Sequence, residues 1–317
     1  MRLLTGILVL GGGMFAAEFP SAEISNGLIT AKLYLPDPEK GYYRGTRFDW
    51  SGNMYSLKTK NHEYFGQWFE KYDPKLHDAI MGPVEEFKTN NAGLGYDEAK
   101  AGGTFIRIGV GVVRKPEEAG YQNFKTYEIL DPGQWDVKAE KSRIRFTHVL
   151  KGPDGYAYRY TKWIALEKGK NRMRIEHTLE NIGRKQIQTQ QYNHNFFVMD
   201  GQPTGPESVV QFPFELRQTR AFPNGLAEAR GKEIRYTAEL EKGQSTYGEF
   251  AGAAPYDIRM ENRKAKAGVH ITGDVPIAKL VYWSIRTTFC PEPYIDLTVD
   301  PGKKTRWTYV YEFYDLP

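Results

Sequence analysis

Two side chains in the second half of the chain have the types needed for acid–base chemistry, and the first is His194. It lies in residues 188–201, a stretch with a period of two that carries amides, a phenol and the imidazole on both faces. Imidazole has the unperturbed pKa closest to neutral pH, so His194 could act as a general acid. Its neighbours Asn193 and Asn195 offer hydrogen-bond partners to a hydroxylated ligand. The alternative is a satisfied polar residue on an interior strand.

The second side chain is Glu292, which lies between Pro291 and Pro293. The two prolines restrict the backbone and remove two backbone donors. With Cys290 and Tyr294 close in sequence, an apolar surrounding would raise the pKa of the carboxyl group and make it a usable base. A glutamate on a surface loop is an equally good interpretation of the sequence alone.

Three further polar residues could contact the same ligand. Arg47 could hold a ligand oxygen, or it could pair with a carboxylate such as Asp49. His77 could bind the ligand or cap a short helical turn. Asp257 opens a predicted strand, where a turn or capping role is the more common one. None of these residues identifies a chemistry by itself.

The residue types that bind metals or nucleotides do not occur at recognisable spacings. There is no HExxH, CxxC or His-x-His motif, which argues against a structural zinc ion, whereas calcium bound by loop carboxylates stays open. Gly109 and Gly111 lack the strand–turn–helix context of a dinucleotide site, and there is no P-loop or Gly-x-Ser-x-Gly elbow. We therefore expect neither a cofactor nor a metal.

The elements that must position these groups are short strands separated by turn residues. They are predicted at residues 24–35, 54–59, 104–113, 135–140, 143–149, 156–166, 172–181, 234–240, 268–271, 278–285 and 306–313. No long amphipathic helix pattern is present. Strands at a spacing of roughly 8–12 residues are typical of sandwiches and barrels. We predict an all-β protein, a large antiparallel β-sandwich with few short helices.

Length and composition limit the protein classes. The chain has 317 residues, and a chain near this size can bury roughly 75% of its unfolded surface. Cys290 is the only cysteine, so no disulfide can form within the chain, and we expect it to be a small buried hydrophobic residue. The net charge of +4, without a Lys/Arg-rich block, gives no reason to expect nucleic-acid binding.

The N-terminus has the pattern of a targeting segment. Arg2 precedes an apolar run at residues 3–10, and Ala16 and Ala17 follow. This predicts a signal peptide at residues 1–17, a single domain at residues 18–317, and a periplasmic or secreted protein without a membrane anchor. The apolar run is too short for a transmembrane helix. The alternative is a buried N-terminal strand of a cytosolic protein.

A set of short motifs, taken in order, resembles the aldose 1-epimerase (galactose mutarotase-like) family. The motifs are Gly45-Thr46-Arg47, the segment at residues 77–83, Asn193-His194-Asn195-Phe196-Phe197, Tyr256-Asp257, Cys290-Pro291-Glu292-Pro293 and Pro301-Gly302. Phe196 stands where the family has a tyrosine, Val198 where it has an asparagine, and the region after Glu292 is shorter. The set extends over nearly the whole mature chain and indicates a divergent branch.

The resemblance implies a galactose mutarotase-like β-sandwich that interconverts the α and β anomers of an aldose by acid–base ring opening. Glu292 would take the proton from the C1 hydroxyl, and His194 would protonate the ring oxygen from the opposite side of the sugar. Arg47 and His77 would bind hydroxyls or stabilise a developing oxyanion, and Asp257 would hold a pair of hydroxyls. Three aromatic residues are candidates for stacking on the sugar or, equally, for core packing: Trp68, Tyr192 and Trp283.

Two other function classes stay open. One is a non-catalytic carbohydrate-binding protein of the same fold, and the other is a polysaccharide-processing accessory enzyme such as a lyase, for which Tyr192 beside His194 is the candidate. If Glu292 and His194 lie across one pocket with room for a pyranose ring, the epimerase is favoured. In each case we expect a monomer whose partner is a small-molecule sugar, with no nucleic acid and no membrane.

Overall fold

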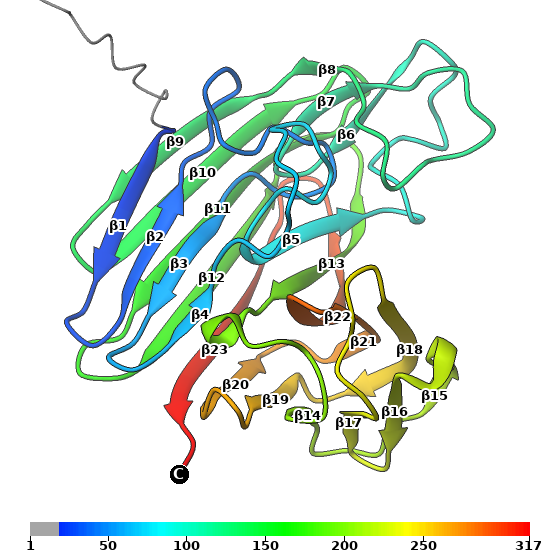
Figure 1. Ribbon diagram of the computed structural model, residues 1–317. Coiled ribbons are helices and arrows are strands. Elements are labelled where there is room, and N and C mark those ends of the chain that lie inside the picture. Colours follow the sequence, from blue (N-terminus) through cyan, green and yellow to red (C-terminus); the bar gives the residue numbers. More distant parts are fainter. Residues whose placement is uncertain (1–18) are drawn as a thin grey trace, which may run out of the picture.

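The regular secondary structure is almost entirely antiparallel strands in a computed structural model that describes residues 19–317 (Figure 1). The predicted signal peptide lies outside the described residues. Two short 3-10 turns, η1 (Met199–Gly201) and η2 (Pro223–Gly225), are the helical elements of the described part. None of the described helices has the length and apolarity to cross a membrane. The prediction of an all-β fold with few short helices is confirmed.

Four sheets make up the fold. The first has the order β1 (Ser21–Ser25), β2 (Thr30–Tyr34), β3 (Met54–Lys58) and β4 (Glu63–Phe65). A ten-stranded sheet has the order β16 (Ala227–Arg230), β17 (Glu233–Tyr236), β14 (Ser208–Gln211), β19 (Asp257–Asn262), β20 (Ala267–Gly273), β23 (Lys304–Asp315), β12 (Arg172–Asn181), β11 (Ala157–Leu166), β10 (Arg143–Lys151) and β9 (Gln134–Ala139).

The third sheet carries the residues singled out from the sequence. Its order is β15 (Gln218–Arg220), β18 (Ser245–Ala254), β21 (Ile277–Ile285), β22 (Thr288–Val299), β13 (Ile187–Phe196) and β5 (Gly82–Lys88). The small fourth sheet consists of β6 (Thr104–Arg107), β7 (Gly111–Arg114) and β8 (Ile129–Asp131).

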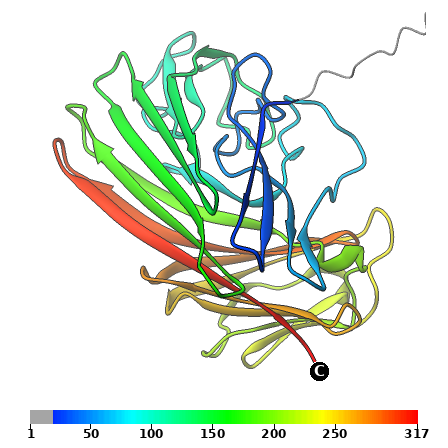
Figure 2. The same cartoon turned by 90° about the vertical axis from the view of Figure 1, so that its left-hand side faces the viewer.

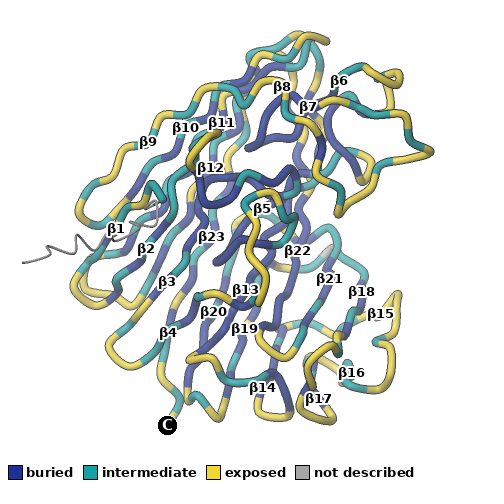
Figure 3. Tube along the Cα trace, turned by 45° about the horizontal axis from the view of Figure 1, so that its top comes forward, coloured by how far each residue is buried: buried dark blue, intermediate teal, exposed yellow. Residues whose placement is uncertain are grey.

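The long curved ten-stranded sheet is the common wall of the molecule. Figure 2 shows that the sheet of β1–β4 and the six-stranded sheet both lie on one side of this ten-stranded sheet, over different parts of it. One continuous hydrophobic core contains residues of all three, for example Leu33 of β2, Ile164 of β11 and Ile295 of β22. The inward faces of the strands are buried, and the outer face of the ten-stranded sheet and many loops are at least partly exposed (Figure 3). Strands β5, β13 and β22 are buried on both faces over most of their length. This is the layered packing expected of a β-sandwich.

Two of the predicted strands are hairpins instead. Residues 24–35 divide into β1 and β2 at Gly27, which has a φ of +90°, and the turn is held by Asn26 Oδ1, which accepts from the backbone nitrogens of Leu28 and Ile29. Residues 104–113 divide into β6 and β7 around Gly109, at a φ of +79°. In both places a glycine in the left-handed region reverses the chain where the residue pattern predicted continuous strands.

Strand β13 has polar residues on both faces because each face has a separate use. Its odd-numbered residues point into the sandwich, where Tyr309 Oη donates to Gln191 Oε1 at 2.5 Å and Tyr311 Oη donates to Asn195 Oδ1 at 2.8 Å. Both tyrosines belong to β23 of the opposite sheet. The even-numbered residues, among them His194, consequently point to the outer face of the six-stranded sheet.

Candidate active site

His194 and Glu292 lie side by side on the outer face of the six-stranded sheet. His194 Nε2 is 3.3 Å from Glu292 Oε1. The residues are 3% and 5% exposed, so the pair is almost completely removed from water. The structure therefore brings the two predicted catalytic residues together, but in direct contact rather than on opposite sides of a ligand. The reason is that β13 and β22 are neighbours in the sheet.

The prolines beside Glu292 interrupt the ladder between these two strands. Backbone pairing of β13 with β22 ends at Tyr192–Tyr294, and an isolated bridge joins Phe197 to Phe289 further on. Pro291 and Pro293 have no N–H to donate across the gap. The side chain of Asn195 replaces one of the missing contacts, because its Nδ2 donates to the Pro291 carbonyl at 3.0 Å. His194 and Glu292 lie in this interrupted stretch.

The pair forms part of the wall of a pocket of about 230 Å³. Aromatic side chains form one part of the wall: Phe124, Tyr192, Tyr247, Trp283 and Tyr294. Polar side chains form the other: Arg47, Asp78, Lys88 and Asn123. This combination of flat apolar surfaces with convergent polar groups is typical of sites for small polar ligands.

Arg47 is held rigidly at the edge of the pocket. Its Nε donates to Glu86 Oε2 at 3.1 Å, its Nη2 donates to Tyr192 Oη at 3.2 Å, and its Nη1 donates to Asp78. The guanidinium lies over the ring of Phe48 at 4.5 Å. Although burial acts to lower it, these partners raise the pKa of Arg47 well above its usual range. The residue is thus a fixed positive charge beside the acid–base pair.

His77 does not line the pocket, but it supports a residue that does. Its Nε2 is 3.0 Å from Asp78 Oδ2, and its ring lies 4.8 Å from that of Phe124. Burial opposes ionisation of Asp78, but Arg47 and His77 lower the pKa of this carboxyl group to about 2. Asp78 is therefore an ionised acceptor at neutral pH.

Two predicted binding residues lie away from the pocket wall. Asp257 starts β19 in the ten-stranded sheet and lies 2.8 Å from His270 Nε2, so it belongs to a different sheet from the pair. Trp68 stacks on Phe196 at a centroid distance of 4.5 Å, and its Nε1 donates to the Ile80 carbonyl at 2.9 Å. For Trp68 the core-packing alternative describes its position, whereas Tyr192 and Trp283 are pocket residues.

Several pocket residues were not identified as ligand-binding from the sequence. They include Lys88, Asn123, Phe124 and Tyr247. No sequence signal pointed to Lys88, because residues 82–88 were not among the predicted strands; on β5 this residue shares a strand face with Glu86. Among residues 19–317, no group of three or more His, Cys, Asp or Glu side chains is arranged to hold a metal ion.

Burial shifts the pKa values of both residues in the directions that favour their uncharged forms. It raises the pKa of Glu292 to about 7, against the opposing charges of Arg47 and Lys88. Burial also lowers the pKa of His194 well below its usual range, and Arg47 adds to the effect. The imidazole ring stacks on Phe196 at 3.9 Å, and its Nδ1 has no hydrogen-bond partner among the described residues.

The result is a carboxyl group and a neutral imidazole that hold one proton between them near pH 7. Because the pKa of Glu292 lies near neutral pH, this carboxyl group can give or accept a proton there, and the neutral imidazole of His194 can accept one. Because the pair is buried beside a fixed cation, it can act on a ligand that develops negative charge.

Comparison with known proteins identifies the fold. No protein-family model and no curated protein sequence matches the chain. Among solved structures, it is similar to a galactose mutarotase-like protein from Clostridium acetobutylicum, with a TM-score of 0.58 and 13% identity over 93% of this chain and 95% of that one. It is also similar to an aldose epimerase homologue from Caenorhabditis elegans, with a TM-score of 0.56 and 14% identity over 94% and 99%.

The chain has the galactose mutarotase-like fold. A third structure, a galactose mutarotase-like protein from Lactobacillus casei, matches with a TM-score of 0.55 and 13% identity, covering 93% of this chain and all of that one. The similarity extends over nearly the full length in each case at low identity, as expected for a divergent member of the fold. The predicted resemblance is confirmed at the level of the galactose mutarotase-like fold.

Proposed function

We propose that the protein is an aldose 1-epimerase, which interconverts the α and β anomers of a sugar by opening and closing its ring. The observation that carries the proposal is the 3.3 Å contact between His194 Nε2 and Glu292 Oε1 in the wall of a small pocket. The reaction moves two protons at two oxygens that are both bonded to C1. Neighbouring acid and base groups can reach both oxygens at once, so positions on opposite sides of the sugar are not required.

Ring opening uses the single proton that the pair shares. The Glu292 carboxylate takes the proton of the C1 hydroxyl while the His194 imidazolium gives its proton to the ring oxygen. The C1–ring oxygen bond breaks and C1 becomes an aldehyde. The pair is left as a carboxyl group and a neutral imidazole, with its number of protons unchanged. Rotation about C1–C2 presents the other face of the aldehyde, and the reverse transfers close the ring.

The uncharged form of the pair is the one that burial favours before a sugar binds. In that form the roles are reversed, because Glu292 gives a proton and His194 takes one. Ring opening from this form gives the Glu292 proton to the ring oxygen and the C1 hydroxyl proton to His194, which leaves a carboxylate and an imidazolium, and the reverse transfers close the ring. Arg47 stabilises the negative charge that develops on the C1 oxygen, and Asp78 accepts hydrogen bonds from sugar hydroxyls.

The size of the pocket matches a small substrate. Pockets for drug-sized ligands range from about 300 to 1,000 Å³, and this one is smaller. One sugar ring is the ligand that combines this size with many hydroxyl groups and an apolar face for the tyrosine and tryptophan rings.

The test is anomer interconversion of a panel of aldoses, followed by polarimetry and NMR exchange spectroscopy. His194→Ala and Glu292→Gln are each expected to lower the enzyme-catalysed rate by about 10²–10⁴-fold, because each removes one positioned proton-transfer group. His62→Ala is a matched control, since this histidine pairs with Asp200 outside the pocket.

Two outcomes would contradict the proposal. Either variant could retain the parent rate, or the parent protein could fail to exceed the rate in buffer with every aldose tested. Sugar binding without turnover would instead identify the protein as a carbohydrate-binding module of the same fold.

A further inference from the structure

The floor of the pocket continues along the same two strands into a second, larger cleft. Beyond the Tyr192–Tyr294 pair, Gln190 is paired with Asp296 and Gln188 with Thr298. Alternate residues of a strand share one face, so these side chains lie in line with His194 and Glu292. Successive pairs on that face are about 6.8 Å apart. The two strands thus form one track that runs away from the acid–base pair.

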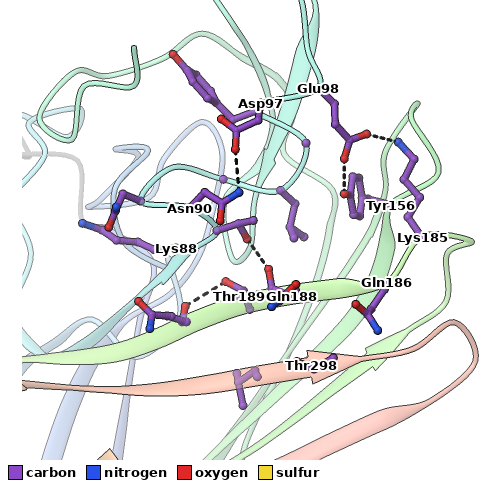
Figure 4. A pocket seen from close by; sticks show the side chains of 18 of the residues that line it. Lys88, Asn90, Asp97, Glu98, Tyr156, Lys185, Gln186, Gln188, Thr189 and Thr298 are labelled. Atoms are coloured by element: carbon purple, nitrogen blue, oxygen red, sulfur yellow. Dashed lines mark hydrogen bonds and ion pairs between the residues drawn. The ribbon is translucent and has the colours of Figure 1, made fainter. Parts of the chain in front are cut away.

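The cleft at the far end of this track has a volume of about 980 Å³. Figure 4 shows β13 and β22 as its floor and the loop at residues 89–98 above it. The side chains that line it are mainly amides and hydroxyls, including Asn90, Gln188 and Thr298. Amide and hydroxyl groups both donate and accept hydrogen bonds, as a sugar hydroxyl also does.

Lys88 joins the cleft to the pocket, because it lines both. Its Nζ donates to Asn123 Oδ1 at 3.2 Å and lies 3.8 Å from Glu86 Oε1. It also stands next to the track, since β5 pairs Lys88 with Gln190 of β13. A ligand that leaves the pocket along the track passes this side chain.

The carboxylates of the cleft already have partners within it, one a lysine and two amide donors, which favours a neutral ligand. Lys185 Nζ is 2.5 Å from Glu98 Oε2, and Gln190 Nε2 donates to Asp296 Oδ1 at 2.8 Å. Asp97 likewise accepts from Asn90 Nδ2 at 2.9 Å (Figure 4). An anionic ligand would have to displace these carboxylates, whereas a polyhydroxylated neutral ligand can add hydrogen bonds to them.

We propose that the substrate is the reducing end of a linear neutral oligosaccharide. Its reducing-end ring occupies the pocket and the following units lie over Gln190, Asp296 and Gln188 in the cleft. This assignment rests on the proposed epimerase function, because only the reducing-end unit has a free anomeric carbon. A pocket of about 230 Å³ holds that unit, and the following units extend into the larger cleft, which shares Lys88 with the pocket.

The test compares kcat/KM for the mono-, di- and trisaccharide of one neutral aldose series. The parent is expected to act on the trisaccharide at least about tenfold more efficiently than on the monosaccharide, the effect of one or two added hydrogen bonds. In Gln190→Ala this ratio is expected to fall to near one. Gln218→Ala is the matched control, because Gln218 is an exposed glutamine of the same sheet that lies outside both cavities.

A parent ratio near one, or a ratio that Gln190→Ala leaves unchanged, would overturn the cleft assignment while turnover of the monosaccharide upheld the epimerase. Calorimetric titration of the parent with the trisaccharide separates the two failures. If no sugar is turned over but the trisaccharide binds at least about tenfold more tightly than the monosaccharide, and Gln190→Ala removes that difference, the epimerase proposal fails and the oligosaccharide cleft stands. Equal binding of both sugars would overturn the cleft.

Discussion

Glu85 and Glu292 are both buried carboxylates of the six-stranded sheet, yet their surroundings oppose each other. Glu85 points into the sandwich, where Lys162 Nζ lies at 2.8 Å, His177 Nε2 at 2.7 Å and Tyr160 Oη at 2.8 Å. Burial alone would raise its pKa, but His177 and Lys162 hold the pKa of Glu85 well below its usual range.

Among residues 19–317, Glu292 has one ion-pair partner, His194, and its pKa is raised to about 7. Burial therefore does not by itself turn a carboxylate into a base. The number of cations and donors at contact distance decides whether a buried carboxylate is a structural ion or a group that exchanges protons near neutral pH.

The largest effect is expected on folding from Glu85→Gln. The variant leaves a buried lysine and histidine without their shared carboxylate, so we expect a loss of about 3–5 kcal/mol in the free energy of unfolding. Denaturant unfolding monitored by circular dichroism measures it. Glu176→Gln, on an exposed position of β12, is the control. A loss no greater than that of the control would mean that the interior network contributes nothing to stability.

Glu292→Gln should increase the free energy of unfolding, in contrast to Glu85→Gln, and the size of the increase should depend on pH. Because the folded-state pKa is raised from 4.5 to about 7, the stability that Glu292 contributes is present below about pH 4.5 and is lost as the pH rises through about 7. Relative to the parent, the variant should therefore gain up to about 3 kcal/mol between pH 4.5 and pH 8. Unfolding curves at both pH values measure it, and an equal difference at each would contradict the assigned pKa.

The catalytic rate should also depend on the protonation of Glu292. Above about pH 7 the free enzyme loses the proton that the pair shares, so kcat/KM is expected to fall about tenfold per pH unit. The measurement is enzyme-catalysed exchange between pH 6 and 9 after subtraction of the buffer rate. A level profile above pH 7 would show that the pair does not need its single proton.

The smallest effect is expected from Asp257→Asn. This carboxylate pairs with His270 at the start of β19, outside the pocket, so we expect an unchanged epimerase rate and a stability change below about 1 kcal/mol. Rate measurement and thermal unfolding check both. A large loss of rate with unchanged folding would restore the binding role that the resemblance implied.

The sequence was sufficient to predict the fold class and to single out His194 and Glu292, and the reasons are physical. Alternation on β13 puts His194 on one face and Asn193 on the other, because the period of a strand is fixed by covalent geometry. Which face is outward could not be read from it, since both are polar. The answer depends on Tyr309 and Tyr311 of β23, which use the interior amides.

Other parts of the site depend on packing between distant segments. Lys88 and Asn123 carry no sequence signal that distinguishes them from surface residues. They meet only because β5 pairs with β13 in the sheet and the loop before β8 brings Asn123 to Lys88. Asp257 was assigned from a short motif. The motif's position in the ten-stranded sheet could not be inferred from spacing along the chain.

Pro291 and Pro293 are a case in which a sequence rule would have given the wrong answer. A rule that excludes proline from central strands would reject β22, and β22 was indeed absent from the predicted strands. In the folded chain these two prolines prevent backbone pairing between β13 and β22 beside His194 and Glu292. The gap leaves room for the imidazole and the carboxyl group. The position of the acid–base pair thus depends on two N–H groups that the backbone lacks.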